Sequence, residues 1–448
     1  MARLPRSTPG APKRSYSAIS TCSAGAIRAT ASLLALLCGQ PATAQTPPAP
    51  VARVTFNEAI RRAQQNNPTV AAAAAGILRA EGLVGQARAA TLLQLSGNVT
   101  TTTLNTGIEF AGQTVTPQSS VTASFTATMP ILAAAAWARR AQAQDTRHVA
   151  ELTVAETRRQ IAFAAADAYL AILAQRRIVE SSIRARDASR AHYDLARELE
   201  QRGTGSRLNA LRAQQLVSTN EGLLETGRLA LYRAQEALGV LIVADGPADA
   251  IDEPDFAVPP PADDPATSAE PYRADLRLFA AEQQAAERVL RDSAKDWWPT
   301  IDALFTPSTQ YPAQLFLPQN TWRFLTQTNV PLFDSGSRAA VKIQRRADVD
   351  QVRARLTGAS IQASSEVRAA RAAIASIERT VAASREAADE ARQVETITNI
   401  SFRAGAATNI EVIDAERSAR DLDTAVVVAE DQLRRARLEM LNALGRFP

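Results

Sequence analysis

Hydrophobic positions along this chain repeat with two different spacings, which alternate in blocks. Over residues 121–129, apolar side chains take the odd positions and Thr or Ser takes the even ones. A period of two predicts a β-strand with one apolar and one hydroxyl face. Residues 93–103, 300–305 and 322–330 alternate in a similar way. Polar stretches rich in Gly or Pro, 105–118 and 307–319, separate the members of each pair, so the sequence predicts two β-hairpins.

Two other blocks, 132–201 and 333–402, have apolar residues spaced by three and four and contain no internal proline. This spacing predicts coiled-coil helices, each roughly 105 Å long. The first helix carries two seams, one through Ala165 and one through Leu170, which predicts a neighbour on each side. Shorter helices are expected at 56–90, 206–242 and 408–444, with a weak point at Pro68. The first and last helices of a unit are predicted to stack end to end beside the long one.

The order of these elements occurs twice. Gly203 and Leu208 are echoed by Gly405 and Ile410, 202 residues later. Residues 128–132 and 237–239 have similar echoes at 329–333 and 443–445. The sequence therefore predicts a duplication with repeats at 54–244 and 271–448. Residues 245–270 hold six prolines and eight acids without Lys or Arg, which is typical of an inter-repeat linker.

The N-terminal 44 residues resemble a leader. A basic stretch is followed by a short apolar run and by small residues at 42–44. This pattern predicts a signal peptide, 1–44, cleaved after Ala44, and a short linker, 45–53. Acylation of Cys38 is the alternative to cleavage after Ala44. A start of translation downstream of Met1 is a further alternative, because the basic region is long.

Charge changes the picture once the leader is set aside. The formal charge of +4 comes with five basic residues and no acid in 1–44, so the remaining chain has 45 basic and 46 acidic residues. Arginines are interspersed with acids along the predicted helices, which argues against a nucleic-acid partner. No nucleophile triad, phosphate loop or metal-ligand spacing is found, so we expect neither an enzyme nor a cofactor or metal site.

Four strands cannot close a barrel, and open sheet edges do not sit in lipid. Three chains would supply twelve strands, enough for a channel, with hydroxyl faces toward water and apolar faces toward lipid. The predicted fold is therefore mainly α: long coiled-coil helices forming an α-barrel, with four strands per chain contributing to a trimeric transmembrane β-barrel.

The chain resembles the TolC family of outer-membrane efflux proteins over residues 54–445. The matching motifs are Phe-Asn-Glu-Ala at 56–59, Asn67-Pro68, prolines 130 and 331 at strand-to-helix junctions, and the segment 401–415 around Gly405. The resemblance implies an outer-membrane homotrimer with a long periplasmic extension. It also implies a periplasmic adaptor and an inner-membrane pump as partners.

The family's gate falls on identifiable positions. Glu411 and Asp414 match acidic rings at the periplasmic entrance, where stacked carboxylates would bind cations and repel anions. An ordinary solvated helix face is the alternative for this acidic pair. Gly203 and Gly405 match the helix tips that meet the adaptor. The gate neighbours are Phe402, Ala407 and Asn209. An arginine expected at Ala407 and an acid expected at Asn209 are missing, so Arg207 or Arg403 is expected to help hold the closed state.

Three functions are compatible with this sequence. The first is a passive exit duct of a tripartite pump that exports small molecules such as drugs or toxic compounds. The second is the outer-membrane component of type I protein secretion. The third, a periplasmic coiled-coil scaffold, leaves the four alternating segments without a purpose. The sequence of a passive duct does not identify the exported compound or the class of the pump.

Overall fold

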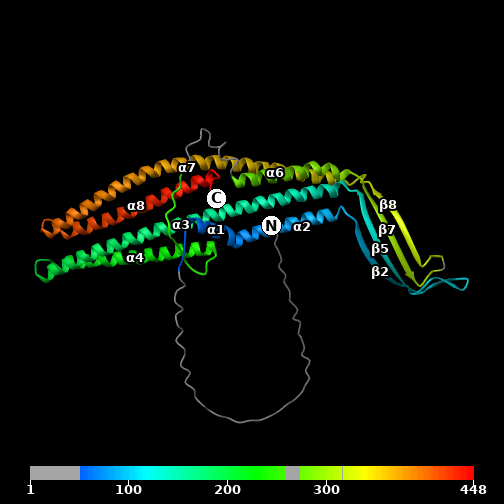
Figure 1. The fold of residues 1–448 in the computed structure, drawn as a ribbon, viewed down its shortest axis with the longest axis horizontal. Coiled ribbons are helices and arrows are strands. Elements are labelled where there is room, and N and C mark those ends of the chain that lie inside the picture. Colours follow the sequence, from blue (N-terminus) through cyan, green and yellow to red (C-terminus); the bar gives the residue numbers. More distant parts are fainter. Residues whose placement is uncertain (1–50, 258–272, 315, 448) are drawn as a thin grey trace, which may run out of the picture. The chain divides into compact units, whose positions relative to one another are not determined.

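Two very long helices dominate the chain. The computed structural model describes residues 51–257, 273–314 and 316–447. In it, α3 spans Ala134–Gln201 and α7 spans Ser337–Arg403 (Figure 1). The predicted long helices are confirmed, although α7 begins after Gly336 and not at 333, because Gly336 has a φ of 87° and cannot continue the helix. The predicted leader with Cys38, residues 45–50 and residues 258–270 lie outside the described residues.

Shorter helices lie beside each long helix. They are α1 (Phe56–Asn66), α2 (Pro68–Ala89) and α4 (Arg207–Ile242), which pack on α3, and α6 (Ala274–Asp292) and α8 (Asn409–Ala443), which pack on α7. A short 3-10 helix, η1 (Ser293–Trp297), follows α6. In Figure 1, α2 and α4 cover opposite halves of α3, as the stacking prediction requires. Ala165 and Leu170 have no exposed surface, so both predicted seams of α3 are packed.

The predicted weak point near Pro68 is a break between α1 and α2. Asn67 has an extended backbone, and its side-chain oxygen accepts the N–H of Thr69 at 2.9 Å. Its amide nitrogen donates to the carbonyl of Leu241 at the end of α4, at 3.1 Å. Pro68 then takes the first position of α2, where a missing N–H costs nothing. None of the described helices has the length and apolar composition needed to cross a membrane.

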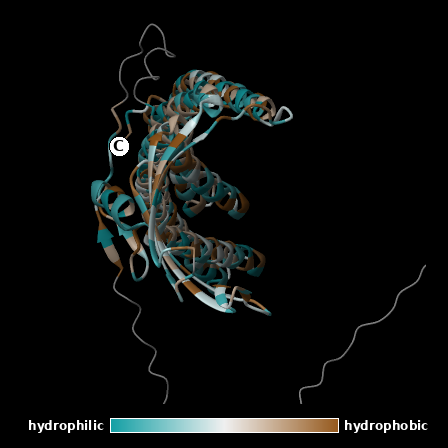
Figure 2. Ribbon diagram, turned by 90° about the vertical axis from the view of Figure 1, so that its right-hand side faces the viewer, coloured by the Kyte–Doolittle hydropathy of each residue, from teal (hydrophilic) through white to brown (hydrophobic). Residues whose placement is uncertain are grey.

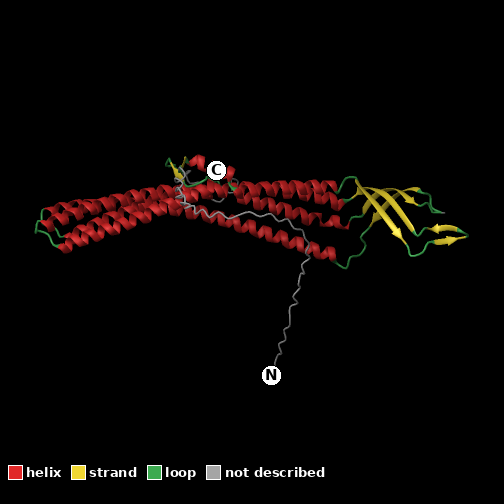
Figure 3. Cartoon of the chain, turned by 90° about the horizontal axis from the view of Figure 1, so that it is seen from below, coloured by secondary structure: helices red, strands yellow, loops and turns green. Residues whose placement is uncertain are grey.

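Four strands form one antiparallel sheet at the end of the long helices (Figure 3). They are β2 (Gln94–Thr103), β5 (Ser119–Leu132), β7 (Thr300–Tyr311) and β8 (Asn320–Asn329), in the order β2-β5-β7-β8. The central pair, β5 and β7, brings the two hairpins together. The sequence predicted a plain loop after β2, whereas the structure has a further hairpin there, formed by β3 (Ile108–Phe110) and β4 (Gln113–Thr116).

The strand register sorts the side chains onto two chemically different faces. Phe305 pairs with Phe324, and Pro307 pairs with Trp322, so aromatic side chains gather on one face. On the other face Ser308 pairs with Thr321, and their hydroxyls lie 2.8 Å apart. Partners in an antiparallel pair point to the same side, so the alternation seen in the sequence is confirmed in three dimensions.

The sheet and the helices follow one curve. Seen along the long helices, they lie on a common arc (Figure 2). Strands β2 and β8 are the two edges of the four-stranded sheet. An edge strand presents a row of backbone donors and acceptors that another strand can pair with.

A small parallel sheet lies over the middle of α3. Strand β1 (Ala52–Val54) pairs with β6 (Ala248–Ala250), and Ala248 is fully buried. Within the predicted linker, 245–270, residues 248–250 form a strand that the sequence analysis did not expect. The small side chains of Ala248 and Ala250, on either side of Asp249, are buried, so this stretch can form a strand that packs on the helices. The hydroxyl of Tyr169 on α3 accepts the N–H groups of Ile251 and Asp252, each at 3.1 Å.

Candidate functional site

The two coil pairs, α3/α4 and α7/α8, end in matching turns at the end of the molecule opposite the sheet (Figure 1). Gly203 has a φ of 76° and Gly405 has a φ of 78°. After each glycine, an N–H returns to the last helical turn: Thr204 donates to Leu199 at 3.1 Å and Ala406 donates to Ser401 at 2.8 Å. Glycine adopts this left-handed backbone at little cost, which explains its place in both turns.

The acidic pair predicted for the gate lies in the first turns of α8. Glu411 closes a capping box with Thr408: its N–H donates to the Thr408 hydroxyl at 3.4 Å, and its carboxylate accepts the Thr408 N–H at 2.7 Å. Asp414 lies one turn later, and both side chains are exposed. Glu411 therefore has a structural task at the helix start, while its carboxylate stays open to solvent.

One buried contact joins the two coil pairs close to the tips. His192 on α3 is 3% exposed, and its Nε2 lies 2.9 Å from Oδ1 of Asn409 on α8. The Asn409 amide also donates to the carbonyl of Asn209 on α4, at 3.5 Å. The ring of Phe402 meets the imidazole edge to face, with centroids 5.3 Å apart. Two of the predicted gate neighbours, Asn209 and Phe402, are thus brought together by His192 and Asn409.

The other predicted gate residues do not join this contact. Ala407 lies in the tip turn, where its N–H donates to Ser401 at 3.3 Å. Arg207 and Arg403 are exposed, and within the described part of the chain neither forms an ion pair. The proposed contribution of these arginines to closure would therefore have to come from contacts outside this single chain.

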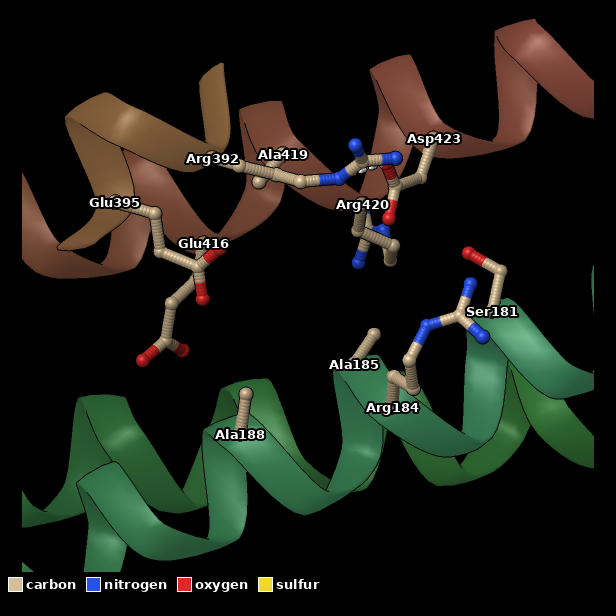
Figure 4. A pocket seen from close by; sticks show the side chains of 10 residues that line it. All are labelled: Ser181, Arg184, Ala185, Ala188, Arg392, Glu395, Glu416, Ala419, Arg420 and Asp423. Carbon is tan, nitrogen blue, oxygen red and sulfur yellow. Dashed lines mark hydrogen bonds and ion pairs between the residues drawn. The ribbon is translucent and has the colours of Figure 1, made fainter. Parts of the chain in front are cut away.

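Further from the tips, a pocket of about 240 Å³ opens between α3 and the α7/α8 pair (Figure 4). Glu416 of α8 lines it and is 8% exposed, and its Oε2 has no hydrogen-bond partner. Burial, together with the charge of Glu395 on α7, raises the pKa of Glu416 to about 7. Burial and the charge of Asp423 also raise the pKa of Glu395.

Polar side chains continue the contact along α3, α4 and α8. Arg420 on α8 donates to Oδ1 of Asn220 on α4 at 2.7 Å. The Asn220 amide donates to the Ser189 hydroxyl on α3 at 3.1 Å, and both residues are buried. Among the described residues, no group of three His, Cys, Asp or Glu side chains is arranged to hold a metal ion.

Sequence reasoning missed His192, Asn409 and Glu416 as members of the contact. Glu416 carried a usable signal, because it follows Val412 by four and precedes Ala419 by three, so a carboxylate occupies an apolar seam position. Asn409 and His192 carried none, since they lie 217 residues apart and meet only when the coil pairs pack.

Solved structures similar to this chain include outer-membrane proteins. The chain is similar to the Campylobacter jejuni CmeC outer membrane channel, with 13% identity, a TM-score of 0.77, and coverage of 88% of this chain and 86% of that one. It is similar to the Vibrio cholerae outer membrane protein VceC, with 19% identity, a TM-score of 0.74, and coverage of 87% and 96%. For the open state of the Neisseria gonorrhoeae MtrE outer membrane channel the values are 16%, 0.75, 87% and 88%.

These similarities establish the fold: paired long helices that continue into a small antiparallel sheet, as in outer-membrane channels. The family follows from the sequence itself. The outer membrane efflux protein family matches residues 59–242 and 267–446, and this chain belongs to it. No curated protein matches the sequence significantly. The predicted resemblance to the TolC-like channels is therefore confirmed.

Proposed function

We propose that three copies of this chain close into a channel-tunnel that serves as the passive exit duct of a tripartite efflux pump. The observation that carries the proposal is the four-stranded sheet, with one aromatic face, one hydroxyl face and two edges at β2 and β8. Three such sheets would pair edge to edge into twelve strands, with the aromatic face toward lipid and the hydroxyl face toward water.

The helices support the same assembly. The arc of helices in Figure 2 would form one part of the wall of a tube. Further copies placed side by side would complete the tube. On α7, Ile343, Ile361 and Ile397 are 71%, 64% and 63% exposed. Apolar side chains in such a row are expected to pack against a neighbouring chain. The helical part would then form a tunnel that extends from the outer membrane into the periplasm.

The tips supply the proposed contacts with partners. The turns at Gly203 and Gly405 would meet a periplasmic adaptor, which connects the tunnel to an inner-membrane pump. Glu411 and Asp414 would form two rings of carboxylates around the entrance, with Asn209, Phe402 and Ala407 as neighbours of the gate. The cargo would be small molecules such as drugs or toxic compounds, and the pump would select them, because a passive duct only conducts what the pump delivers.

Purified full-length protein in planar lipid bilayers tests this proposal. We expect discrete conductance steps, and a cross-linked band at the mass of three chains from the same preparation. Protein that is folded and trimeric but never conducts would exclude the duct. Protein that stays monomeric in membranes would exclude the closure of the sheet by three copies.

Adaptor docking is tested separately. Gly203 and Gly405 would each be replaced by Asp in a strain that carries the matching adaptor and pump. Loss of efflux and of co-purification with the adaptor, with conductance retained, is the expected result. Unchanged co-purification would argue against the tips as the docking surface.

A further inference from the structure

The contact between α3 and α8 buries a carboxylate without a counter-ion. Glu416 is 8% exposed, lines the pocket between α3, α7 and α8, and leaves its Oε2 without a hydrogen-bond partner. A buried, unpaired charge is costly, and the cost disappears when the carboxyl binds a proton. Packing of the two coil pairs therefore disfavours the ionised form of Glu416.

Two of the three arginines that line the pocket are paired with other groups. Arg392 pairs with Asp423 at 2.6 Å and with Asp389 at 2.7 Å. Arg420 pairs with Asp421 at 2.7 Å and donates to Asn220, also at 2.7 Å.

Figure 4 shows Arg184 beside Ser181 at one end of the pocket, with Glu395 and Glu416 together at the other end. Glu395 is thus the charge that faces Glu416. The three arginines that line the pocket also disfavour a metal ion as the missing partner.

We propose that Glu416 acts as a proton-operated clamp between the α3/α4 pair and the α7/α8 pair. With its carboxyl protonated, the two pairs pack as in this structure. With the carboxyl ionised, Glu416 and Glu395 repel each other inside the contact, and the pairs separate at this level. The clamp lies within one chain, so it does not depend on which compound the channel carries.

The direction of the pH effect follows from the pKa. Burial and the Glu395 charge raise the pKa of Glu416 from 4.5 to about 7. Between these values the packed form holds a proton that the separated form has lost. Packing is therefore favoured in acid and weakens as the pH rises through 7. His192, in the same interface, has a pKa lowered by its burial, so burial disfavours its charged form.

The distance between α3 and α8 reports the clamp directly. Nitroxide labels would be attached to cysteines introduced by Arg190→Cys on α3 and Ser418→Cys on α8, both exposed positions. The native cysteines, Cys22 and Cys38, both lie in the predicted leader. The labelled full-length chain, diluted with unlabelled chain in detergent micelles, would be frozen at pH values from about 5.5 to 8.5 for pulsed electron paramagnetic resonance, because a carboxyl with a raised pKa titrates in this range.

We expect the distance distribution to shift to longer values with a midpoint near pH 7. Glu416→Gln should hold the short distance at every pH, because the amide cannot ionise. Glu395→Gln should move the midpoint to lower pH, because one of the charges that raise the Glu416 pKa is gone. Glu390→Gln, an exposed position of α7 outside the pocket, is the matched control and should behave as the native chain.

An unchanged distance across this pH range would overturn the proposal, as would an undiminished shift in Glu416→Gln. If Glu416→Gln does not fold, Glu395→Gln decides by its midpoint. Conductance in planar bilayers is measured on the same proteins and tests the channel separately, so the clamp can fail while the duct stands.

Discussion

At the scale of single residues, Tyr169 shows how one side chain fixes the middle of the molecule. It has no exposed surface, and its hydroxyl donates to the Asp252 carboxylate while accepting the N–H groups of Ile251 and Asp252. The ring of Phe56 packs against it edge to face at 5.4 Å. Helix α3, helix α1 and the segment after β6 therefore meet on one side chain.

Tyr169→Phe is expected to destabilise the chain by about 1–3 kcal/mol, because two buried N–H groups lose their acceptor. Thermal unfolding followed by circular dichroism would measure the loss. Tyr193→Phe, a partly exposed position on the same helix, is the control and should change stability little. Equal unfolding midpoints for the two variants would contradict this role of Tyr169.

The same residue predicts a loss of stability in alkali. Burial and the hydrogen bond to the Asp252 carboxylate raise the pKa of Tyr169 from 10.0 to about 12. The folded state thus keeps a proton that the unfolded state loses, so stability present below pH 10 is lost as the pH rises from 10 to 12. Denaturant unfolding in this range should show a steeper loss for the native chain than for Tyr169→Phe. Parallel curves would show that Tyr169 does not contribute.

Asn409 is the residue whose loss should affect the tips most. Asn409→Ala removes the partner of His192 and the contact with Asn209, and leaves both ring nitrogens of a buried histidine unpaired. Such a change costs about 1–3 kcal/mol, so the coil pairs should separate more often. We expect longer or more frequent openings in planar bilayers. Ser418→Ala, exposed on the same helix, should conduct as the native protein. Identical traces for both variants would show that Asn409 does not hold the coil pairs together.

At the scale of elements, successive side chains of each strand alternate between the two faces of the sheet. Phe324 and Leu325 are neighbours on β8 and point to opposite faces: Phe324 lies opposite Phe305, and Leu325 lies opposite Leu304 on the hydroxyl face. The two positions share a strand, a size class and a local backbone. They differ in whether they are proposed to face lipid or water, which makes them a matched pair for testing the orientation.

Phe324→Arg should reduce insertion strongly, because an arginine on the lipid side of a barrel costs about 2–4 kcal/mol at mid-membrane depth. Leu325→Arg should be tolerated, since water would solvate the guanidinium. The amount of folded trimer in outer-membrane fractions measures both. Equal loss in the two variants, or a greater loss for Leu325→Arg, would show that the orientation is reversed or that the sheet does not face lipid.

At the scale of the whole molecule, the two repeats differ where the proposed gate lies. Asn209 of the first repeat corresponds to Glu411 of the second, 202 residues later, so only one tip of each chain carries this acid. Three chains would therefore place three Glu411 and three Asp414 carboxylates around the axis. A ring of like charges at a narrow entrance concentrates cations and excludes anions.

Combined Glu411→Gln and Asp414→Asn should lower the preference of the channel for cations several-fold, because the fixed negative charge at the entrance is removed. Reversal potentials in asymmetric salt measure this preference. Glu390→Gln, distant from the tip on α7, is the control. A preference that survives the double substitution would place the selectivity elsewhere in the tunnel.

The sequence by itself determined the local elements and their order. A period of two defined the strands, spacings of three and four defined α3 and α7, and Gly203 and Gly405 marked the turns, because these features depend on neighbours a few residues away. The duplication also predicted that the second hairpin and the second long helix correspond to the first. The apolar and hydroxyl faces of the sheet could also be predicted, because strand pairing keeps the alternation of side chains that each strand already has.

Only the tertiary structure decided which distant side chains meet. The strand at 248–250 was hidden in a segment whose prolines and acids indicated a linker, and it forms because β1 supplies the missing backbone partners. His192 meets Asn409, and Glu416 loses its solvent, only when two coil pairs pack at one rotation and one register. The pattern of a helix fixes which face is buried, but the neighbour that buries it comes from another part of the chain.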